Sequence, residues 1–158
     1  MALQKTNAMR ILDKEKVFYN IINYENKDGK IDGVAVAKKI GRANEEVFKT
    51  LVTISNTKNI YIFLIPVDKE IDFKKAAKVT GEKSIEMINV NDLKKITGYI
   101  RGGCSPIGMK KQYVTFIHRS AEELKTIVFS AGKIGVQLEV STEDLKNVIP
   151  FTYHDIIK

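Results

Sequence analysis

The sequence is poor in the residues that define several large classes of protein. Its 158 residues include one cysteine, two histidines, three prolines and no tryptophan. A single cysteine cannot form an internal disulfide and offers no zinc-binding spacing, which excludes a disulfide-stapled secreted domain and a zinc module. Neither a P-loop nor a dinucleotide-binding glycine motif occurs. We therefore predict no bound metal and no cofactor.

Long hydrophobic runs are also missing. No window approaches the roughly 20 apolar residues that a membrane span needs, and the stretch MALQKTNAMRILDK has no apolar segment of signal-peptide length. We expect no contact with a membrane and a cytoplasmic location. The composition is 44% hydrophobic, which is enough for a core, and no linker or repeat divides it. Residues 1–158 are expected to form one domain.

Positive charge is present in excess. The 26 lysines and arginines exceed the 19 acidic residues, which gives a net charge of +7. Such an excess favours a polyanionic partner, most commonly nucleic acid, although lysines that merely solvate helix faces are the alternative. The lysines form scattered pairs, as in Lys94-Lys95 and Lys110-Lys111. This pattern is typical of a broad charged surface rather than a disordered basic arm.

Hydrophobic patterning predicts an α/β fold around a mixed, partly curled sheet. Helices are expected over residues 6–16, 34–40, 72–80, 91–97 and 141–149. Strands are expected over residues 17–24, 47–55, 58–67, 84–90, 114–119, 126–132 and 134–140. The turn at Ser55-Asn56 predicts a hairpin. His154 is expected in a mobile C-terminal segment.

The stretch YIRGGCSPIG, residues 99–108, holds the single cysteine and three glycines. A catalytic thiolate needs a base, usually histidine, and neither His118 nor His154 belongs to a local catalytic motif. We interpret Cys104 as a buried or half-buried structural thiol. The N–H groups of Gly102 and Gly103 suit an oxyanion or a phosphate. A simple tight turn explains these glycines equally well.

Two further features suggest a polar cleft. The stretch FSAGKIG is a second glycine-rich loop, and two such loops at strand ends are expected to face the same cleft. Lys49 is the one cation in the apolar strand VFKTLVTIS. It either points to solvent or reaches into the cleft, where a lysine can hold a phosphate or a carbonyl oxygen.

These segments, in this order, resemble the YbaK family of freestanding aminoacyl-tRNA editing proteins, and among them the Cys-tRNA(Pro) deacylases. The resemblance also extends to the editing domain inserted in prolyl-tRNA synthetases. It is carried by KTNAMRILDK, VFKTLVT, IPVDKEIDFKKAAKVTGEKSIEM, TGYIRGGCSPIGMKKQ and SAGKIGVQLEV. It implies a single domain with a mixed, barrel-like sheet surrounded by helices, and a cleft for the 3′-aminoacyl end of a tRNA.

The resemblance also implies the site residues. The expected catalytic residues are Lys49, Gly102 and Gly103. The expected substrate-binding residues are Tyr24, Thr50, Arg101, Ser105, Pro106, Ser130, Gly132 and Gln137. Cys104 does not correspond to a catalytic residue of the family. Some members carry an acidic residue where this chain has Gln137, and some carry an aromatic residue near Asp32, where this chain has Ile31.

The implied activity is removal of cysteine in trans from mischarged Cys-tRNA(Pro), and also from Cys-tRNA(Cys), with the substrate's own thiol as nucleophile. The implied partners are the 3′ end of the aminoacylated tRNA and prolyl-tRNA synthetase. Two alternatives stay open. One is a deacylase for another mischarged tRNA, such as Ala-tRNA(Pro), that uses water as nucleophile. The other is a non-catalytic module that binds aminoacyl-tRNA.

Overall fold

The computed structural model of the chain describes residues 4–158, so residues 1–3 of the expected domain lie outside the described part. The helices are α1 (Asn7–Lys14), α2 (Gly33–Lys39), α3 (Phe73–Thr80), α4 (Leu93–Thr97) and α5 (Thr142–Leu145). The strands are β1 (Tyr19–Asn23), β2 (Phe48–Ser55), β3 (Ile60–Pro66), β4 (Ile85–Met87), β5 (Val114–His118), β6 (Thr126–Lys133), β7 (Val136–Ser141) and β8 (Thr152–His154). Three short 3₁₀ turns complete these elements, namely η1 (Asn44–Glu46), η2 (Val90–Asp92) and η3 (Arg119–Glu123).

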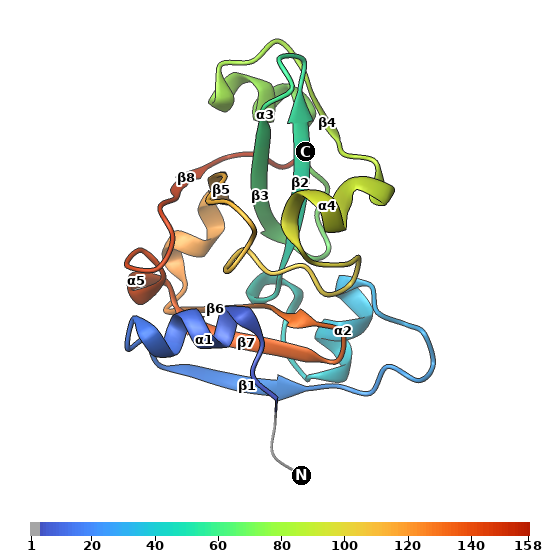
Figure 1. Ribbon diagram of the computed structural model, residues 1–158, viewed down its shortest axis with the longest axis vertical. Coiled ribbons are helices and arrows are strands. Elements are labelled where there is room, and N and C mark those ends of the chain that lie inside the picture. Colours follow the sequence, from blue (N-terminus) through green and yellow to red (C-terminus); the bar gives the residue numbers. More distant parts are fainter. Residues whose placement is uncertain (1–3) are drawn as a thin grey trace.

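The strands form two sheets (Figure 1). A three-stranded antiparallel sheet has the order β1-β7-β6. A five-stranded mixed sheet has the order β4-β2-β3-β5-β8, in which β3, β5 and β8 are parallel. A single parallel bridge between Val47 and Val128 joins the start of β2 to β6. The expected α/β fold with a mixed, barrel-like sheet is confirmed.

Helices cover both faces of the three-stranded sheet. On one face, Met9 and Leu12 of α1 are fully buried in the same cluster as Phe129 and Leu138. On the other face, Ala37 of α2 belongs to a smaller cluster around the Val47–Val128 bridge. Complete burial of a side chain the size of leucine or methionine stabilises the fold by roughly 1.5–3 kcal/mol. The apolar periodicity of these segments therefore explains the layering.

Local signals explain several boundaries. The Thr6 hydroxyl accepts a hydrogen bond from the Met9 N–H, as an N-cap does. The Asp72 carboxylate accepts from the N–H groups of Lys74 and Lys75, and Gly81 ends α3 in the left-handed conformation. The hairpin of β2 and β3 also agrees with the prediction.

The C-terminal prediction was wrong in two respects. The expected helix 141–149 stops at Leu145, and turns follow in which the Asn147 N–H donates to the Asp144 carbonyl and the Val148 N–H to the Leu145 carbonyl. Pro150 disfavours helical geometry at Ile149 and so prevents the helix from continuing past it. The segment around His154 is not a loose tail. It forms β8, in which Ile117 lies opposite Tyr153 and His118 lies opposite His154.

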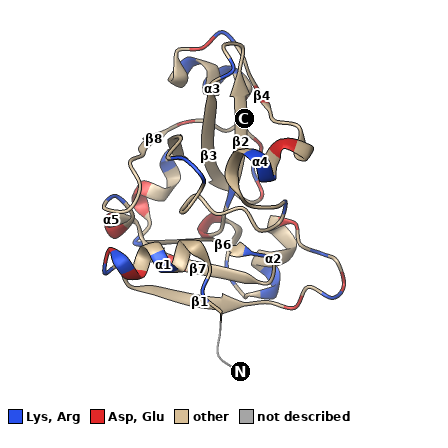
Figure 2. Ribbon diagram, viewed as in Figure 1, with Lys and Arg blue, Asp and Glu red and all other residues tan. Residues whose placement is uncertain are grey.

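Lysines and arginines lie mainly on helices and connecting segments, and the strands carry few of them (Figure 2). None of the helices in residues 4–158 is long and apolar enough to cross a membrane.

Candidate active site

A cavity of about 790 Å³ lies where β2, the segment before α2, the β4–α4 region and the 101–104 loop meet. Six of the predicted site residues line it: Lys49, Thr50, Arg101, Gly102, Ser130 and Gln137. Cys104 also lines it. Strand β2 and the two glycine-rich segments therefore do face one cavity, as the sequence predicted. Its volume is in the range of small-molecule sites, which span roughly 300–1,000 Å³.

Lys49 lies in β2 opposite Ile65 of β3 and is half-buried. Burial lowers the pKa of its ammonium below the usual value, and the carboxylates of Glu70 and Asp68 act against that shift. Within residues 4–158, no carboxylate comes within ion-pair distance of Lys49. The cavity therefore contains a partly desolvated cation whose charge no neighbouring side chain neutralises.

Two predicted substrate-binding residues have buried hydroxyl groups without hydrogen-bond partners in the described chain. These residues are Thr50, which lines the cavity, and Tyr24, which does not. The Tyr24 N–H donates to the Gly135 carbonyl at 2.9 Å and so extends the β1–β7 ladder. A buried hydroxyl without a partner costs about 1–3 kcal/mol. The Thr50 hydroxyl is therefore a ready hydrogen-bonding group for a ligand.

The Gly102-Gly103 turn presents only one of its two glycines to the cavity. Gly102 has φ +84°, and a methyl group there would meet Ile31 Cδ1 at 2.6 Å. Gly103 is buried, and its N–H donates to the Ile100 carbonyl at 2.9 Å. The turn thus uses the Gly103 N–H for its own closure. No residue of 4–158 accepts a hydrogen bond from the Gly102 N–H.

Ser130 and Gln137 face each other across β6 and β7. Gln137 is 6% exposed, and the Ser130 hydroxyl accepts a hydrogen bond from the Gly132 N–H at 3.1 Å. Ser130 and Gly132 were predicted to lie in a glycine-rich loop. In the structure both lie within β6, at a point where the pairing with β7 is irregular. Ser130 lines the cavity at the start of this irregularity.

Three predicted residues support the site without lining it. Gly132 has φ +97° and packs against the Tyr99 ring, which a methyl group would approach to 2.6 Å. Ser105 is fully buried, and its hydroxyl accepts from the Ile107 N–H. Pro106 is buried beside it. These residues hold the 99–108 loop against β6, which positions Gly102.

Cys104 lines the cavity and is half-buried. Burial raises the pKa of its thiol to about 12, and a hydrogen bond with the Thr97 side chain opposes this. The thiol is therefore protonated at neutral pH and is a poor nucleophile. The structure thus supports a structural thiol.

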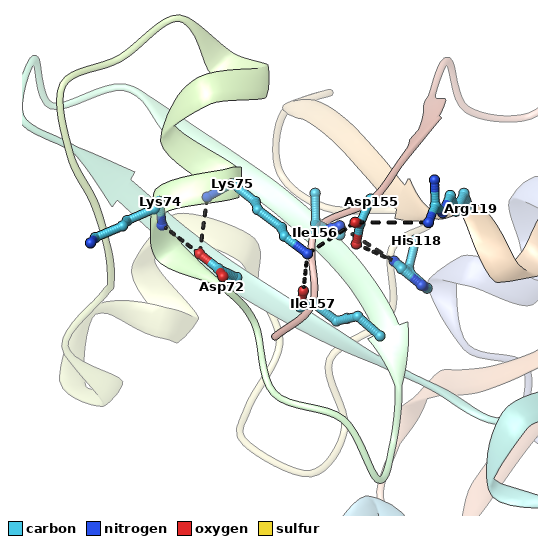
Figure 3. A network of polar contacts seen from close by, with 8 residues as sticks. All are labelled: Asp72, Lys74, Lys75, His118, Arg119, Asp155, Ile156 and Ile157. Atoms are coloured by element: carbon cyan, nitrogen blue, oxygen red, sulfur yellow. Dashed lines mark hydrogen bonds and ion pairs between the residues drawn. The ribbon is translucent and has the colours of Figure 1, made fainter.

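Both histidines lie on the five-stranded sheet and neither lines the cavity. His118 is 6% exposed, and its Nδ1 accepts from the Ile156 N–H at 3.4 Å (Figure 3). Burial lowers the pKa of His118, against the raising effect of Asp155. His118 therefore helps to anchor the C-terminal segment. Residues 4–158 contain no group of three metal-ligating side chains.

The sequence did not reveal the apolar wall of the cavity. Met87, Ile88, Val90 and Leu93 line it from the β4–α4 region. Met87 and Val90 are 43% and 55% exposed, which is unusual for such side chains. The available signal was the group of apolar residues in the stretch SIEMINV, which predicted a strand but not the cavity that the segment faces. Only the packing of β4 against β2 shows that they face the same cavity as Lys49.

The fold and the cavity define a class of protein. Residues 32–148 match the family model of the aminoacyl-tRNA editing domain, and the chain belongs to that family. It is 44% identical over 140 residues to a protein of Enterococcus faecalis (strain ATCC 700802 / V583) whose assigned name is Cys-tRNA(Pro)/Cys-tRNA(Cys) deacylase EbsC. The match covers 89% of this chain and 85% of that protein.

Solved structures show the same fold. The crystal structure of a hypothetical protein, APE2540, matches with a TM-score of 0.87 at 19% identity and covers 97% of this chain and 100% of that one. The crystal structure of a protein described as a trans-editing enzyme for prolyl-tRNA synthetase matches with a TM-score of 0.83 at 15% identity over 99% of both chains. The resemblance to YbaK-type editing proteins is confirmed.

Proposed function

We propose that this chain is a trans-acting deacylase that releases cysteine from mischarged Cys-tRNA(Pro), and also from Cys-tRNA(Cys). The name of the E. faecalis relative supports the choice of cysteine, because that protein is 44% identical to this chain. The observation that carries the proposal is the unneutralised, half-buried Lys49 beside the unpartnered Thr50 hydroxyl in a cavity of about 790 Å³. In this proposal, residues 1–158 act as one editing domain.

The cavity suits a reaction in which the substrate supplies the nucleophile. Its titratable groups are Asp32, Lys49, Arg101 and Cys104. The Cys104 thiol is protonated, and Asp32 caps α2 by accepting from the Ala35 N–H at 3.0 Å. The cavity therefore offers positive charge and hydrogen bonds rather than a strong base. A substrate thiol is already a few per cent thiolate near pH 7 and intrinsically nucleophilic.

In the proposed reaction, the cysteine sulfur attacks the carbonyl carbon of its own ester. An S–C bond forms and negative charge develops on the carbonyl oxygen. The bond from that carbon to the 3′ oxygen of the terminal ribose then breaks, and the 3′ oxygen takes up the thiol proton. The products are a free tRNA and a strained cyclic thioester, which water hydrolyses to cysteine. Holding the sulfur in attack geometry contributes several kcal/mol through proximity.

Six of the predicted site residues have distinct roles in this scheme. The Lys49 ammonium holds the terminal ribose or phosphate and adds positive charge beside the reacting ester. The Gly102 N–H, which makes no hydrogen bond within residues 4–158, donates to the developing oxyanion. Gly103 contributes by closing the turn. Thr50, Ser130 and Gln137 orient the amino acid and the adenosine from β2, β6 and β7.

Selection of the correct tRNA is proposed to involve a partner. The cavity is sized for an aminoacyl end rather than for a tRNA body. Prolyl-tRNA synthetase, which makes the mischarged species, is the partner that the family resemblance implies. Both proteins would then act in the cytoplasm, where tRNA is charged.

The proposal is tested with a panel of Cys-, Ser-, Ala- and Pro-tRNA(Pro) and Cys-tRNA(Cys), each carrying a labelled amino acid. We expect the purified protein to accelerate loss of cysteine from both Cys-tRNAs far above the spontaneous rate. Preference for alanine would support the water-dependent alternative. Slowing of spontaneous hydrolysis would identify a module that only shelters the ester. Either result would overturn the proposal.

A further inference from the structure

The excess positive charge is concentrated in one short segment. Residues 93–113 contain Lys94, Lys95, Arg101, Lys110 and Lys111 and no aspartate or glutamate. Five of the seven excess positive charges of the chain therefore belong to 21 residues. We call these five side chains the basic ridge.

None of the five side chains of the basic ridge forms an ion pair within residues 4–158. All five are exposed. Elsewhere, Lys39 pairs with Asp28 at 2.7 Å and Arg42 contacts both Glu46 and Glu139, whereas Lys14 and Lys78, like the ridge, form no ion pair within residues 4–158. The ridge is therefore distinguished by the clustering of its cations rather than by the lack of ion pairs alone. Lysines that merely solvate a surface would sit among acidic residues of similar number. The ridge lacks them, so its field points to an anionic partner.

The fold brings the two lysine pairs together. The Lys110 N–H donates to the Thr97 carbonyl at 3.1 Å, directly at the end of α4. The Tyr113 hydroxyl donates to the Ile96 carbonyl at 2.7 Å. The segment after Gly108 therefore runs along the end of α4, the helix that carries Lys94 and Lys95 and that is partly blue in Figure 2.

The ridge also adjoins the cavity. Leu93, the first residue of α4, and Arg101 both line it. Arg101 lies next to Gly102, so the ridge begins at the cavity wall and continues outward along α4 and the 110–111 segment. A polyanion whose end enters the cavity would pass over these lysines.

We propose that the basic ridge binds the sugar–phosphate backbone of the acceptor end of the tRNA whose aminoacyl group occupies the cavity. This inference rests on the proposed function and names the surface that the substrate uses outside the cavity. Lysine ammonium groups are mobile point charges that suit phosphates and read no base sequence. The ridge therefore provides affinity for any tRNA end, and the choice among tRNAs is made elsewhere.

The test compares a ridge variant with a matched control. The ridge variant carries Lys94→Gln, Lys95→Gln, Lys110→Gln and Lys111→Gln. The control removes the same charge from exposed lysines in α3 and at and just beyond the end of α1, with Lys14→Gln, Lys16→Gln, Lys74→Gln and Lys78→Gln. Both variants are assayed on full-length Cys-tRNA(Pro) and on 3′-cysteinyl adenosine, which has no phosphates.

We expect the ridge variant to lose about 10- to 100-fold in kcat/KM on the tRNA and to keep its rate on cysteinyl adenosine. The slope of log affinity against log salt should become shallower by about two to four units, because fewer counterions are released. The control should change far less. Equal losses in both variants, or an equal loss on cysteinyl adenosine, would overturn the inference.

Binding of uncharged tRNA separates this inference from the proposed function. Should the wild-type protein fail to release cysteine, the proposed function fails, but the ridge variant must still bind tRNA more weakly with the shallower salt slope. Should cysteine be released while the ridge variant binds tRNA as tightly as wild type, the ridge assignment fails alone.

Discussion

Lys49 and Lys75 are two partly buried lysines of the same chain in opposite electrostatic settings. The Lys75 ammonium donates to Asp155 at 2.9 Å and to the Ile157 carbonyl at 2.8 Å, which ties α3 to the C-terminal segment (Figure 3). Lys49 has no such acceptors within residues 4–158, and burial lowers its pKa. The first lysine is satisfied by the fold, whereas the charge of the second is left for a ligand. This contrast distinguishes a structural cation from a functional one.

Replacement of Lys49 should have the largest effect. Lys49→Ala removes the positive charge beside the reacting ester, and we expect cysteine release to slow by about 10²- to 10³-fold, as for loss of one preorganised electrostatic group. Stability should hold or rise slightly, because a partly desolvated charge disappears. Single-turnover deacylation and thermal unfolding measure both. An unchanged rate of cysteine release would contradict the functional role assigned to Lys49.

Gly102→Ala should impair both stability and rate. The left-handed backbone disfavours a side chain by about 1–2 kcal/mol, and the methyl group would push Ile31 at the cavity wall. We expect release to slow by at least about tenfold through misplacement of the turn. Gly81→Ala is the matched control, because Gly81 has φ +73° with open space around it. The control should lose stability alone, and equal rate losses would contradict the positional role of Gly102.

Thr50→Val should stabilise the protein and also slow the release of cysteine. The substitution keeps the shape and removes a buried hydroxyl without a partner, so the free energy of unfolding should rise by up to about 1 kcal/mol. Loss of a hydrogen bond to substrate should slow release by about three- to tenfold. Thr53→Val, in the same strand, is the control, because the Thr53 hydroxyl donates to the Tyr61 carbonyl at 2.8 Å. Thr53→Val should lower the free energy of unfolding. A change of the same sign in both variants would contradict the assignment of Thr50 as the unpartnered hydroxyl.

Lys75→Ala should show the converse of Lys49→Ala. The Lys75 side chain is 41% exposed, so solvent screens its pair with Asp155. We expect a loss of about 0.2–1 kcal/mol in the free energy of unfolding and an unchanged rate of cysteine release. Lys74→Ala, which removes an exposed neighbour, should change neither. A slowed Lys75→Ala enzyme would break the distinction between the two lysines.

The same pair predicts a small pH dependence. The hydrogen bond from Lys75 holds the pKa of Asp155 below its usual value, against the raising effect of burial. A depressed carboxyl pKa adds stability above the unfolded pKa of about 3.9, and this stability is lost as the pH falls through the folded value. Denaturant titrations between pH 6 and pH 2 should show a weaker pH dependence for Asp155→Asn. An identical dependence in wild type and variant would refute this linkage.

Much of the fold could be predicted because its signals are local. The caps at Thr6 and Asp72 and the turn between β2 and β3 depend on neighbouring residues. Strand β8 could not be predicted in this way, because its partner β5 is distant in sequence and the three residues of β8 show no clear alternation. It forms by pairing with β5, and the fully buried Ile156 that follows it holds the segment against the core.

The residues of the candidate site could be predicted, but the individual role of each residue could not. Resemblance selected Lys49, Thr50 and Ser130, and the structure brings them to one cavity. It could not show that the Gly103 N–H closes the turn, because glycine pairs in turns look alike in sequence. The apolar wall formed by Met87 and its neighbours depends on the antiparallel pairing of β4 with β2, which no short-range pattern encodes.

The central claim is that the reactive sulfur comes with the substrate and that the protein contributes charge, hydrogen bonds and geometry. It is tested most directly with tRNA(Pro) charged with 2-aminobutyrate, in which a methyl group replaces the thiol at nearly the same size. The account predicts release at least about 100-fold slower than from Cys-tRNA(Pro), since the nucleophile is missing. Equal release rates from the two substrates would contradict it.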